Sequence, residues 1–342
     1  MAVSLPQFRP LPSALLLISP FFLWGTAMVA MKGVIPDTEP FFLAGMRLLP
    51  AGVLVLLAAR VMGRSQPKTW QGWAWISLFA LVDGALFQGF LAQGLVRTGA
   101  GLGSVMIDSQ PLAVALMARW LFAEQVGPVG WLGLAFGLAG ISLLGLPDAW
   151  ILGLFQGQLV WQDLPADALS LVRLLFNQGE WLMLLAALSM AVGTVLIPYV
   201  ARHVDPVVAT GWHMILGGVP LFVLSACYET TPWAGIHLSG WGAIAYSTIL
   251  GSAVAYGVFF YLAAQGNLTS LSALTFLTPV FALLFGSLFL SESLSPLQWL
   301  GVSLTLVSIY LINQRAALVD FLKRRWRSLF PPSLESEGDG SA

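Results

Sequence analysis

Long apolar stretches with almost no charge recur along the whole chain, and they constrain its fold more than any other feature. A helix of about 20 such residues crosses the ~30 Å hydrocarbon core of a bilayer. Ten of these stretches can be placed, at residues 13–35, 41–61, 73–96, 102–123, 129–146, 181–201, 204–226, 241–264, 268–290 and 296–313. They predict an all-α integral membrane protein, because a transmembrane barrel would show alternating strands of about ten residues instead.

The composition agrees with this prediction. Hydrophobic residues make up 58% of the chain and charged residues 9%, whereas a soluble domain carries roughly a quarter charged residues. The first apolar stretch follows Arg9 as a secretion signal would, but it is longer than a signal core and has no convincing cleavage site. We therefore expect it to remain as the first helix. The single cysteine, Cys227, excludes an intramolecular disulfide.

The positions of lysine and arginine predict the orientation in the membrane. If the N-terminus is cytoplasmic, eleven of the 15 basic residues lie on the cytoplasmic side. The remaining four are Lys32, Arg47, Arg97 and Arg173. Cytoplasmic loops carry an excess of basic residues, so we expect both termini in the cytoplasm and a location in the cytoplasmic (inner) membrane of a bacterium.

The chain also repeats itself at an offset of 168 residues. This shift superposes the following pairs without a gap: Trp73 and Trp241, Gly89 and Gly257, Ser104 and Ser272, Pro111 and Pro279, Glu124 and Glu292, Pro128 and Pro296. Each copy holds five predicted spans, and an odd number makes the second copy enter the membrane from the opposite side. Inverted repeats of this kind are typical of secondary transporters that alternate access around a site near the midplane.

The predicted organisation therefore has four parts. Residues 13–146 form the first five-helix repeat and residues 181–313 the second. Between them, residues 147–180 form an extracytoplasmic insert with an amphipathic helix, capped by Asp163 and with Pro165 in its first turn. This helix is either structural filler or a gating lid. Residues 314–342 begin as a basic segment suited to an anionic membrane surface and end as a polar, disordered tail.

Three segments of the sequence resemble a known family. They are "FFLWGTAMVAMKGVIPDTEPFFLAGMRLLPAG", "PLAVALMARWLFAEQVGPVGWLGLAFGLAGISLLG" and its echo "PVFALLFGSLFLSESLSPLQWLGVSLTLVSIYLIN". They look like the two EamA domains of the drug/metabolite transporter superfamily. The resemblance implies a ten-helix transporter, usually an exporter of amino acids or other small metabolites. The second copy departs from the pattern, with Val192 in place of Trp24 and Ile215 in place of Arg47.

Four ionisable residues are expected near the middle of the membrane: Arg47, Asp83, Asp108 and His213. Ionisable groups are rare inside membrane helices and tend to mark pathways or pairs. Asp83 is a candidate for proton coupling, while His213 is more typical of a hydrogen-bonded interior histidine than of a proton relay. Arg47 either holds a carboxylate of the substrate or forms a structural ion pair.

Asp108 shares a helix stripe with Ser104 and precedes Pro111, whose kink frees the carbonyl of Ile107. Two interpretations of Asp108 remain open. In one, Asp108 pairs with Arg47 or bonds to a neighbouring helix and only holds the bundle together. In the other, it loads and unloads a proton as substrate moves. Pro111 and Pro279 are the predicted compliant points of the two halves.

Trp24, Gln88, Tyr256 and Thr275 are candidate walls of a central cavity. Lys32 lies near a helix end, where it can extend to the interface. Glu124 and Glu292 precede the helices opened by Pro128 and Pro296, where an acidic residue complements the helix dipole.

The glycines of "GAGLGS" join two membrane helices and follow no strand, so they form a turn and no nucleotide-binding loop. Gly133, Gly137 and Gly140 form a small-residue face for close packing, either within one chain or in a homodimer.

These observations predict a secondary transporter of a small metabolite, which acts without a cofactor and binds no nucleic acid. The alternatives are a passive channel or assembly subunit, and an intramembrane lipid-modifying enzyme. The enzyme is disfavoured because His203 and His213 lie on different helix faces, with no nucleophile beside them. No metal-ligand spacing and no Ser/His/Asp set is present in the sequence.

Overall fold

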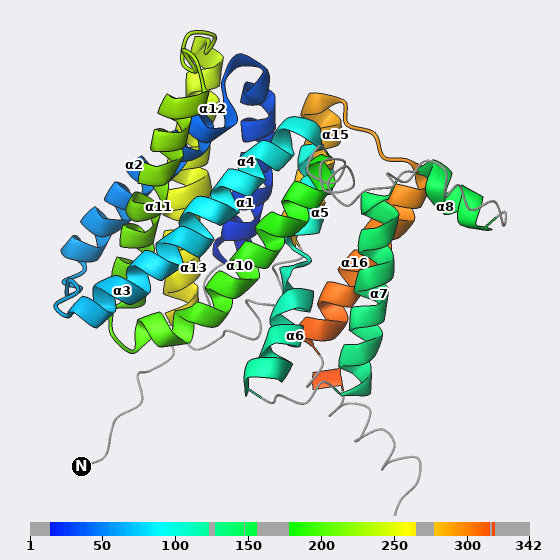
Figure 1. Cartoon of the computed structure of the whole chain (residues 1–342), viewed down its shortest axis with the longest axis horizontal. Helices are drawn as coiled ribbons and strands as arrows, with labels where there is room; N and C mark the ends of the chain where they lie inside the picture. Colours follow the sequence, from blue (N-terminus) through cyan, green and yellow to red (C-terminus); the bar gives the residue numbers. More distant parts are fainter. Residues whose placement is uncertain are drawn as a thin grey trace, which may run out of the picture.

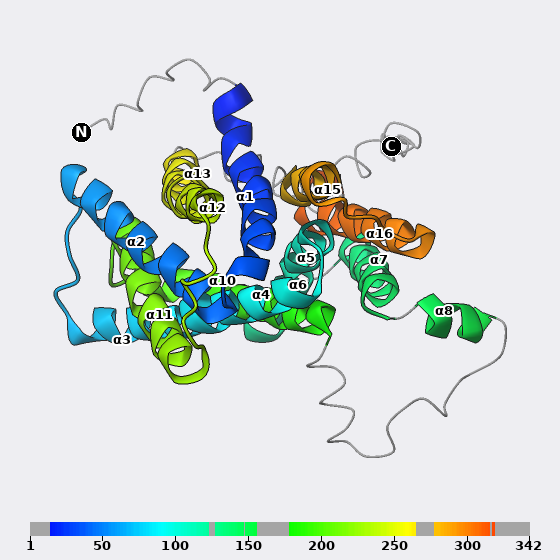
Figure 2. The same ribbon diagram turned by 90° about the horizontal axis from the view of Figure 1, so that it is seen from above.

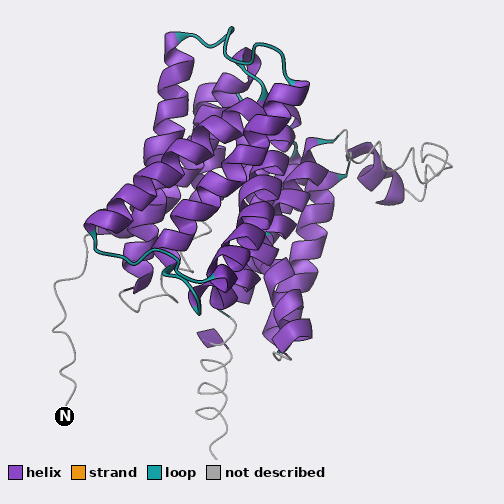
Figure 3. Ribbon diagram, turned by 60° about the vertical axis from the view of Figure 1, so that its left-hand side comes forward, coloured by secondary structure: helices purple, strands orange, loops and turns teal. Residues whose placement is uncertain are grey.

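A computed structural model describes residues 14–122, 127–146, 148–155, 178–264, 277–314 and 317–318. All regular elements in these ranges are helices (Figures 1 and 3). The first repeat contributes α1 (Ala14–Val34), η1 (Ile35–Asp37), α2 (Pro40–Val61), α3 (Trp70–Phe79), η2 (Ala80–Leu86), α4 (Phe87–Arg97), α5 (Ala100–Ile107), α6 (Gln110–Phe122) and α7 (Pro128–Gly145). The remainder contributes α8 (Asp148–Phe155), α10 (Gly179–Ala201), α11 (Pro206–Tyr228), α12 (Leu238–Thr248), η4 (Ile249–Val254), α13 (Ala255–Ala264), α15 (Leu277–Leu290) and α16 (Pro296–Asn313).

The chain is an integral, multi-pass, all-α membrane protein. Each of the ten predicted stretches contains helix, and seven helices are long and apolar enough to cross a bilayer. The other three, α7, α15 and α16, are apolar but shorter in the part of the chain that is described. Three elements, α3, η2 and α4, run on as one span from Trp70 to Arg97. In the same way α12 and η4 continue directly into α13.

The two ends of the helix bundle can be named by their residues. The Asp37 face holds η1, the turn at Thr98 and Gly99, and residues 229–237 and 291–295. The Arg64 face holds residues 62–69 and 202–205. The helix α1 runs from the Arg64 face to the Asp37 face, and α10, its counterpart at the 168-residue offset, runs the other way.

Helices related by the offset pack against each other. The pairs are α2 with α11 and α7 with α16, while α5 packs on α15, which the offset sets onto α6. Matched sets also occur among the other contacts: α1 packs on α12, η4, α13 and α15, and α10 packs on their counterparts α3, η2, α4 and α6. Figure 2 shows α1 between α12 and α15, as the contacts require. The arrangement has the twofold character that a repeated sequence of opposite direction predicts.

Both repeats contain a π-helical turn at the same place. The segment η2 covers Ala80–Leu86, and η4 covers Ile249–Val254, which the offset sets onto residues 81–86. Such turns are rare and often occur at functional sites. Within η2, a Cβ added to Gly84 would lie 2.9 Å from the Cα of Gly217 in α11, so the two backbones approach closely. The π-turns had no predicted counterpart in the sequence.

The glycine face of α7 packs within the chain. Cβ atoms added to Gly133, Gly137 and Gly140 would meet residues of α16, among them Ile312, Ser308 and Gly301. Ser308 also donates a hydrogen bond of 2.5 Å to the carbonyl of Gly133. Figure 1 shows α7 and α16 side by side, next to α6. Of the two uses predicted for these glycines, the described residues support packing inside one chain.

The fourth predicted span is interrupted where the sequence predicted a kink. The helix α5 ends at Ile107, Asp108 and Ser109 form a turn, and α6 begins at Gln110, directly before Pro111. Asp108 is therefore the residue at the break and does not lie inside a helix. Pro279 lies in the first turn of α15, and the residues before Leu277 lie outside the described part.

Some predictions concern residues that lie outside the described ranges. These are Thr275, Glu124, nearly all of the amphipathic helix predicted from Asp163, and most of the tail from residue 315. At the start of the insert the structure has a short helix, α8, that was not predicted. The second half begins with α10 at Gly179, two residues before the predicted start of its first span.

Candidate functional site

The structure brings six of the predicted site residues to the interior of the helix bundle. They come from six elements: Trp24 from α1, Arg47 from α2, Asp83 from η2, Gln88 from α4, His213 from α11 and Tyr256 from α13. Arg47, Gln88 and His213 are buried. Both repeats contribute, as expected for a site between two halves. We call these six residues the central cluster.

Within the central cluster, Asp83 and His213 form a pair. The Nε2 of His213 lies 3.3 Å from the Oδ2 of Asp83. The carboxylate also fits against α10, since a Cβ added to Gly193 would lie 2.6 Å from its Oδ1. The imidazole packs on Phe79, with ring centroids 4.5 Å apart, and its buried Nδ1 has no hydrogen-bond partner among the described residues. Neither pairing partner was predicted for these two residues.

Arg47 is held by uncharged groups. Its Nη1 donates to the sulfur of Met31 at 2.7 Å, and its Nη2 donates to the amide oxygen of Gln88. Its Nε is buried and has no acceptor among the described residues. The ion pairs found in the described part of the chain are Arg64–Asp205 and Asp83–His213. The structural ion pair considered for Arg47 is therefore absent from the described residues.

Aromatic rings form a second part of the central cluster. The rings of Trp24 and Tyr256 meet edge to face with centroids 5.3 Å apart, and Trp24 also contacts Phe259 at 5.4 Å. The indole Nε1 of Trp24 is buried without a partner in the described part of the chain. Tyr256 interacts electrostatically with Asp83 and Arg47. Gln88 and Tyr256 occupy equivalent positions of the two repeats, so one position supplies an amide in one half and a phenol in the other.

Among the described residues, the hydrogen-bond partner of Asp108 lies outside the central cluster. Ser104 donates a hydrogen bond of 3.3 Å to its Oδ2, which agrees with the predicted stripe of Ser104 and Asp108. Nearby in sequence, the side-chain amide of Gln110 donates to Thr194 of α10 at 2.5 Å. No hydrogen bond or ion pair in the described residues joins Asp108 to Arg47. Asp108 thus marks the break between α5 and α6, where these helices pack on α10.

On the Asp37 face, Glu292 connects the two repeats by hydrogen bonds. Its carboxylate accepts hydrogen bonds from the backbone N–H groups of Ala100 at 2.6 Å and Gly101 at 3.1 Å. Glu292 therefore caps α5 of the other repeat, whereas the sequence predicted that it complements the helix opened by Pro296. That helix, α16, is capped by Ser295 with Gln298 in a capping box. A side chain at Gly99 would collide with the Glu292 carboxylate at 2.9 Å.

Two further residues complete this contact. Lys32 of α1 donates to the carbonyls of Leu95 at 2.7 Å and Val96 at 3.3 Å, at the end of α4. Ser291 has a positive φ of 54°, a backbone conformation that is costly for residues other than glycine. This residue immediately precedes Glu292. We call Lys32, Ser291, Glu292 and the α4–α5 turn the Glu292 latch.

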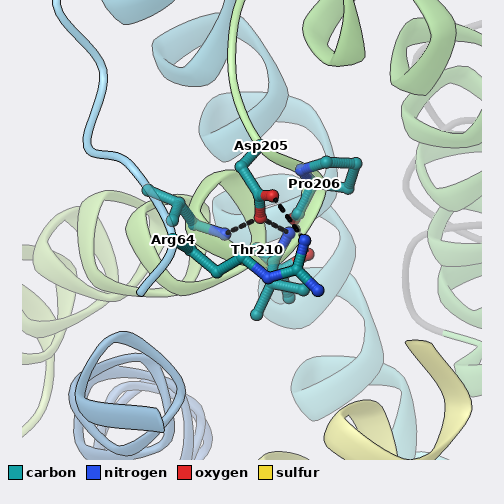
Figure 4. Close-up of polar contacts among 6 residues, drawn as sticks. Arg64, Asp205, Pro206 and Thr210 are labelled. Carbon is teal, nitrogen blue, oxygen red and sulfur yellow. Dashed lines mark hydrogen bonds and ion pairs between the residues drawn. The ribbon is translucent and has the colours of Figure 1, made fainter. Parts of the chain in front are cut away.

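On the Arg64 face an ion pair joins the two repeats. Arg64 donates to the Oδ2 of Asp205 at 3.3 Å, while the Oδ1 of Asp205 caps α11 by accepting from Val207 and Val208 (Figure 4). Thr210 donates to the carbonyl of Pro206 in the same turn. The Arg64 side chain is 42% exposed, and exposed pairs contribute little to stability. This contact is therefore easier to break than the latch on the opposite face.

A groove of about 640 Å³ lies apart from the central cluster, between α1, α12 and α15. Its lining is mainly apolar, with a hydrogen bond of 2.6 Å between the hydroxyls of Thr26 and Tyr246. None of the six residues of the central cluster lines it. Among the described residues, no three His, Cys, Asp or Glu side chains gather to hold a metal ion.

Comparison with known proteins shows which family the chain matches. Two segments, residues 11–146 and 177–314, each match the model of the EamA-like transporter family. An uncharacterized transporter of Synechocystis sp., sll0355, is 63% identical over 320 residues, which is 94% of this chain and 95% of that protein. A chloroplastic WAT1-related protein of Arabidopsis thaliana, At3g02690, is 51% identical over 87% of this chain and 68% of its own length.

More distant relatives carry similar names. The uncharacterized inner membrane transporter YedA of Escherichia coli is 26% identical over 90% of this chain and 92% of its own. A solved crystal structure with 18% identity matches 91% of this chain and 97% of its own with a TM-score of 0.60, which supports the fold alone. The two family matches coincide closely with the two repeats read from the 168-residue offset.

Proposed function

Because the chain belongs to the EamA-like transporter family, we propose that it is a secondary transporter that exports small metabolites, such as amino acids, by alternating access. It works as ten spans in two inverted five-helix repeats, 13–146 and 181–313. The insert at 147–180 is extracytoplasmic and serves as structural filler or as a gating lid, and the tail at 314–342 is cytoplasmic. The substrate and the lipid bilayer are its partners.

One observation carries this proposal: the central cluster lies between two repeats that pack on each other in matched pairs. The π-turn occurs in both repeats at one position; Asp83 lies within it in the first repeat, and Gln88 and Tyr256 follow it within one helical turn in the two repeats. A passive channel needs no such pairing of opposite halves. Transporters use it because each half can adopt the shape of the other, which exchanges the side on which the central site is open.

The proposed cycle follows from these contacts. The Glu292 latch holds the Asp37 face closed, and the weaker Arg64–Asp205 pair releases first on the opposite face. The break at Asp108 and Ser109, and Pro279 in the second half, are the compliant points. Trp24, Gln88, Tyr256 and Thr275 are walls of the pathway. A proton is carried by Asp83 with His213, or by Asp108.

The orientation is proposed from the positions of the basic residues. Arg60, Arg64, Lys68 and Arg202 lie on the Arg64 face, and loops rich in basic residues stay in the cytoplasm. The Arg64 face is therefore cytoplasmic, with both termini, and the Asp37 face is external. The name of the relative YedA, an inner membrane transporter, supports a location in the inner membrane of a bacterium.

Flux through the purified full chain in lipid vesicles tests the proposal. A metabolite panel that includes amino acids is followed with and without an imposed pH gradient. We expect saturable uptake and acceleration of uptake by unlabelled substrate on the far side, which alternating access requires. Flux that rises linearly with concentration supports a passive channel and overturns the proposal. Chemical conversion of added lipid supports the enzyme alternative.

A further inference from the structure

The buried guanidinium of Arg47 lacks an anionic partner among the described residues. The residue is 8% exposed and lies about 10 Å along α2 from the helix start at Pro40. An arginine keeps its positive charge in proteins. A buried charge without a counter-charge is costly, and such residues in membrane helices tend to mark the path of a ligand.

The acceptors present around Arg47 are weak or neutral. Thioether sulfur, as in Met31, is a weak acceptor. The amide oxygen of Gln88 carries no net charge. The guanidinium has five N–H donors, and its Nε has no acceptor among the described residues. The planar fork of donors fits a carboxylate well, because two parallel hydrogen bonds form at once.

The carboxylate of the central cluster is already engaged, and so is that of Asp108. Asp83 faces His213 at 3.3 Å and fits against Gly193, and Asp108 accepts from Ser104. The indole N–H of Trp24 is a further buried donor without a partner in the described residues. The interior therefore offers hydrogen-bond donors and one fixed positive charge, and it lacks a free anion in the described part of the chain.

We propose that Arg47 binds a single carboxylate group of the transported molecule, with Nε and Nη2 as donors, Gln88 holding the guanidinium in place and Trp24 and Tyr256 packing on the ligand. This inference rests on the proposed transport function and names the charge class of its substrate. One fixed cation favours a monovalent carboxylate over a doubly charged phosphate. The second repeat has Ile215 at the equivalent position, so each chain holds one such site.

The first test is thermal unfolding of the purified full chain with Arg47→Gln, whose amide can still donate to Gln88. If Arg47 is an unpaired cation, the variant melts no lower than the wild type without ligand. The matched control is Arg60→Gln, which makes the same change at an exposed position of the same helix. A melting temperature for Arg47→Gln far below that of Arg60→Gln means that Arg47 is a structural ion-pair partner, and overturns the proposal.

The second test adds ligands to the same three proteins and to Arg47→Lys at constant ionic strength. The probes are L-leucine, 4-methylpentanoate and benzoate, each compared with its amide. A ligand that binds the folded state raises the melting temperature in a saturable way. We expect at least one acid to do so at tenfold lower concentration than its amide. The shift persists in Arg60→Gln, weakens in Arg47→Lys and disappears in Arg47→Gln. Equal shifts for acids and amides, no shift for any acid, or a full shift in Arg47→Gln overturn the proposal.

Flux in vesicles separates this inference from the transport function. Saturable flux of uncharged probes that is unchanged in Arg47→Gln retains the transporter and removes the carboxylate site. Carboxylate-dependent stabilisation that needs Arg47, without flux of any probe, retains the site and removes the transporter. Carboxylate flux reduced at least tenfold in Arg47→Gln, and kept in Arg60→Gln, supports both.

Discussion

At the scale of single residues, Asp83 and His213 show how the structure combines signals that were separate in the sequence. They lie 130 positions apart in the chain, and each taken alone is compatible with an ordinary interior role. Their atoms meet at 3.3 Å beside a π-turn and a glycine that leaves room for the carboxylate. A paired carboxylate and imidazole can exchange a proton with a pathway that reaches them.

Replacement of Asp83 by Asn tests this role. The change keeps the size of the side chain and removes its charge. If the pair carries the coupling proton, uptake driven by a pH gradient falls at least tenfold, while exchange of labelled for unlabelled substrate without a gradient continues. Asp108→Asn is the matched variant at the other candidate. If Asp108→Asn loses gradient-driven uptake and Asp83→Asn keeps it, Asp108 is the coupling residue and the Asp83–His213 pair is structural.

Gly193→Ala tests the close fit around Asp83. The added Cβ would lie 2.6 Å from the Asp83 Oδ1 and 2.8 Å from its Cβ. Because overpacking of this kind costs about 1–3 kcal/mol, we expect a lower melting temperature in detergent. Gly257→Ala is the control, since no described residue outside its own stretch of helix comes within 4 Å of the added Cβ. That change should be neutral or stabilising by up to about 1 kcal/mol. Equal melting temperatures for the two variants would contradict the packing described here.

At the scale of elements, the Glu292 latch connects the end of α15 to the start of α5 and so joins the two repeats. The first turn of a helix carries unsatisfied N–H groups and a positive partial charge, which a carboxylate satisfies. Ser291, in the left-handed region, directly precedes the carboxylate. Strain of this kind persists only where the surroundings enforce it, and it clusters at switch regions. The latch is therefore a contact that is suited to break when the Asp37 face opens.

Glu292→Gln should weaken the latch without removing the side chain. We expect faster hydrogen exchange at the amides of Ala100 and Gly101, and a loss of about 1–2 kcal/mol from the charge-assisted bonds. Glu229→Gln is the matched control, because Glu229 caps α2 through Phe41 and Phe42 in the same way. That variant should speed exchange at Phe41 and Phe42 alone. Unchanged exchange at Ala100 in Glu292→Gln would show that the cap does not hold this turn.

At the scale of the whole molecule, the two repeats run in opposite directions. Each face of the bundle therefore combines connections that follow different helices of their repeats. The Asp37 face combines the connection of α1 to α2 with that of α11 to α12. These two connections are not equivalent in the repeat, since one follows the first helix of its half and the other follows the second. Only inversion places such unlike connections on one side of a membrane.

Labelling of cysteines from each side tests the inversion. The native Cys227 is exposed in the last turn of α11, at the Asp37 face. On intact cells it should react with a membrane-impermeant maleimide. In a Cys227→Ser background, Ser65→Cys, in the exposed loop that follows α2 of the first repeat at the Arg64 face, should react only after the membrane is permeabilised. Reaction of both positions from one side would disprove the opposite orientation of the halves, and alternating access would then lose its structural basis.

The sequence by itself determined the class of fold. Spans are encoded locally, because a bilayer requires each crossing helix to be continuously apolar and to satisfy its own backbone. The repeat was equally visible, since Pro111 and Pro279 or Glu124 and Glu292 keep one register. The break before Pro111 followed from the missing N–H of proline.

Only the tertiary structure decided which of these residues meet. Arg47 lies against Met31 and Gln88 instead of Asp108, Asp83 meets His213, and Glu292 caps a helix of the other repeat. The sequence did not predict the π-turns either, because the apolar pattern of a span changes little when one turn widens. Local sequence encodes how a segment satisfies its own backbone, whereas the partner of a buried charge depends on which distant helices pack beside it.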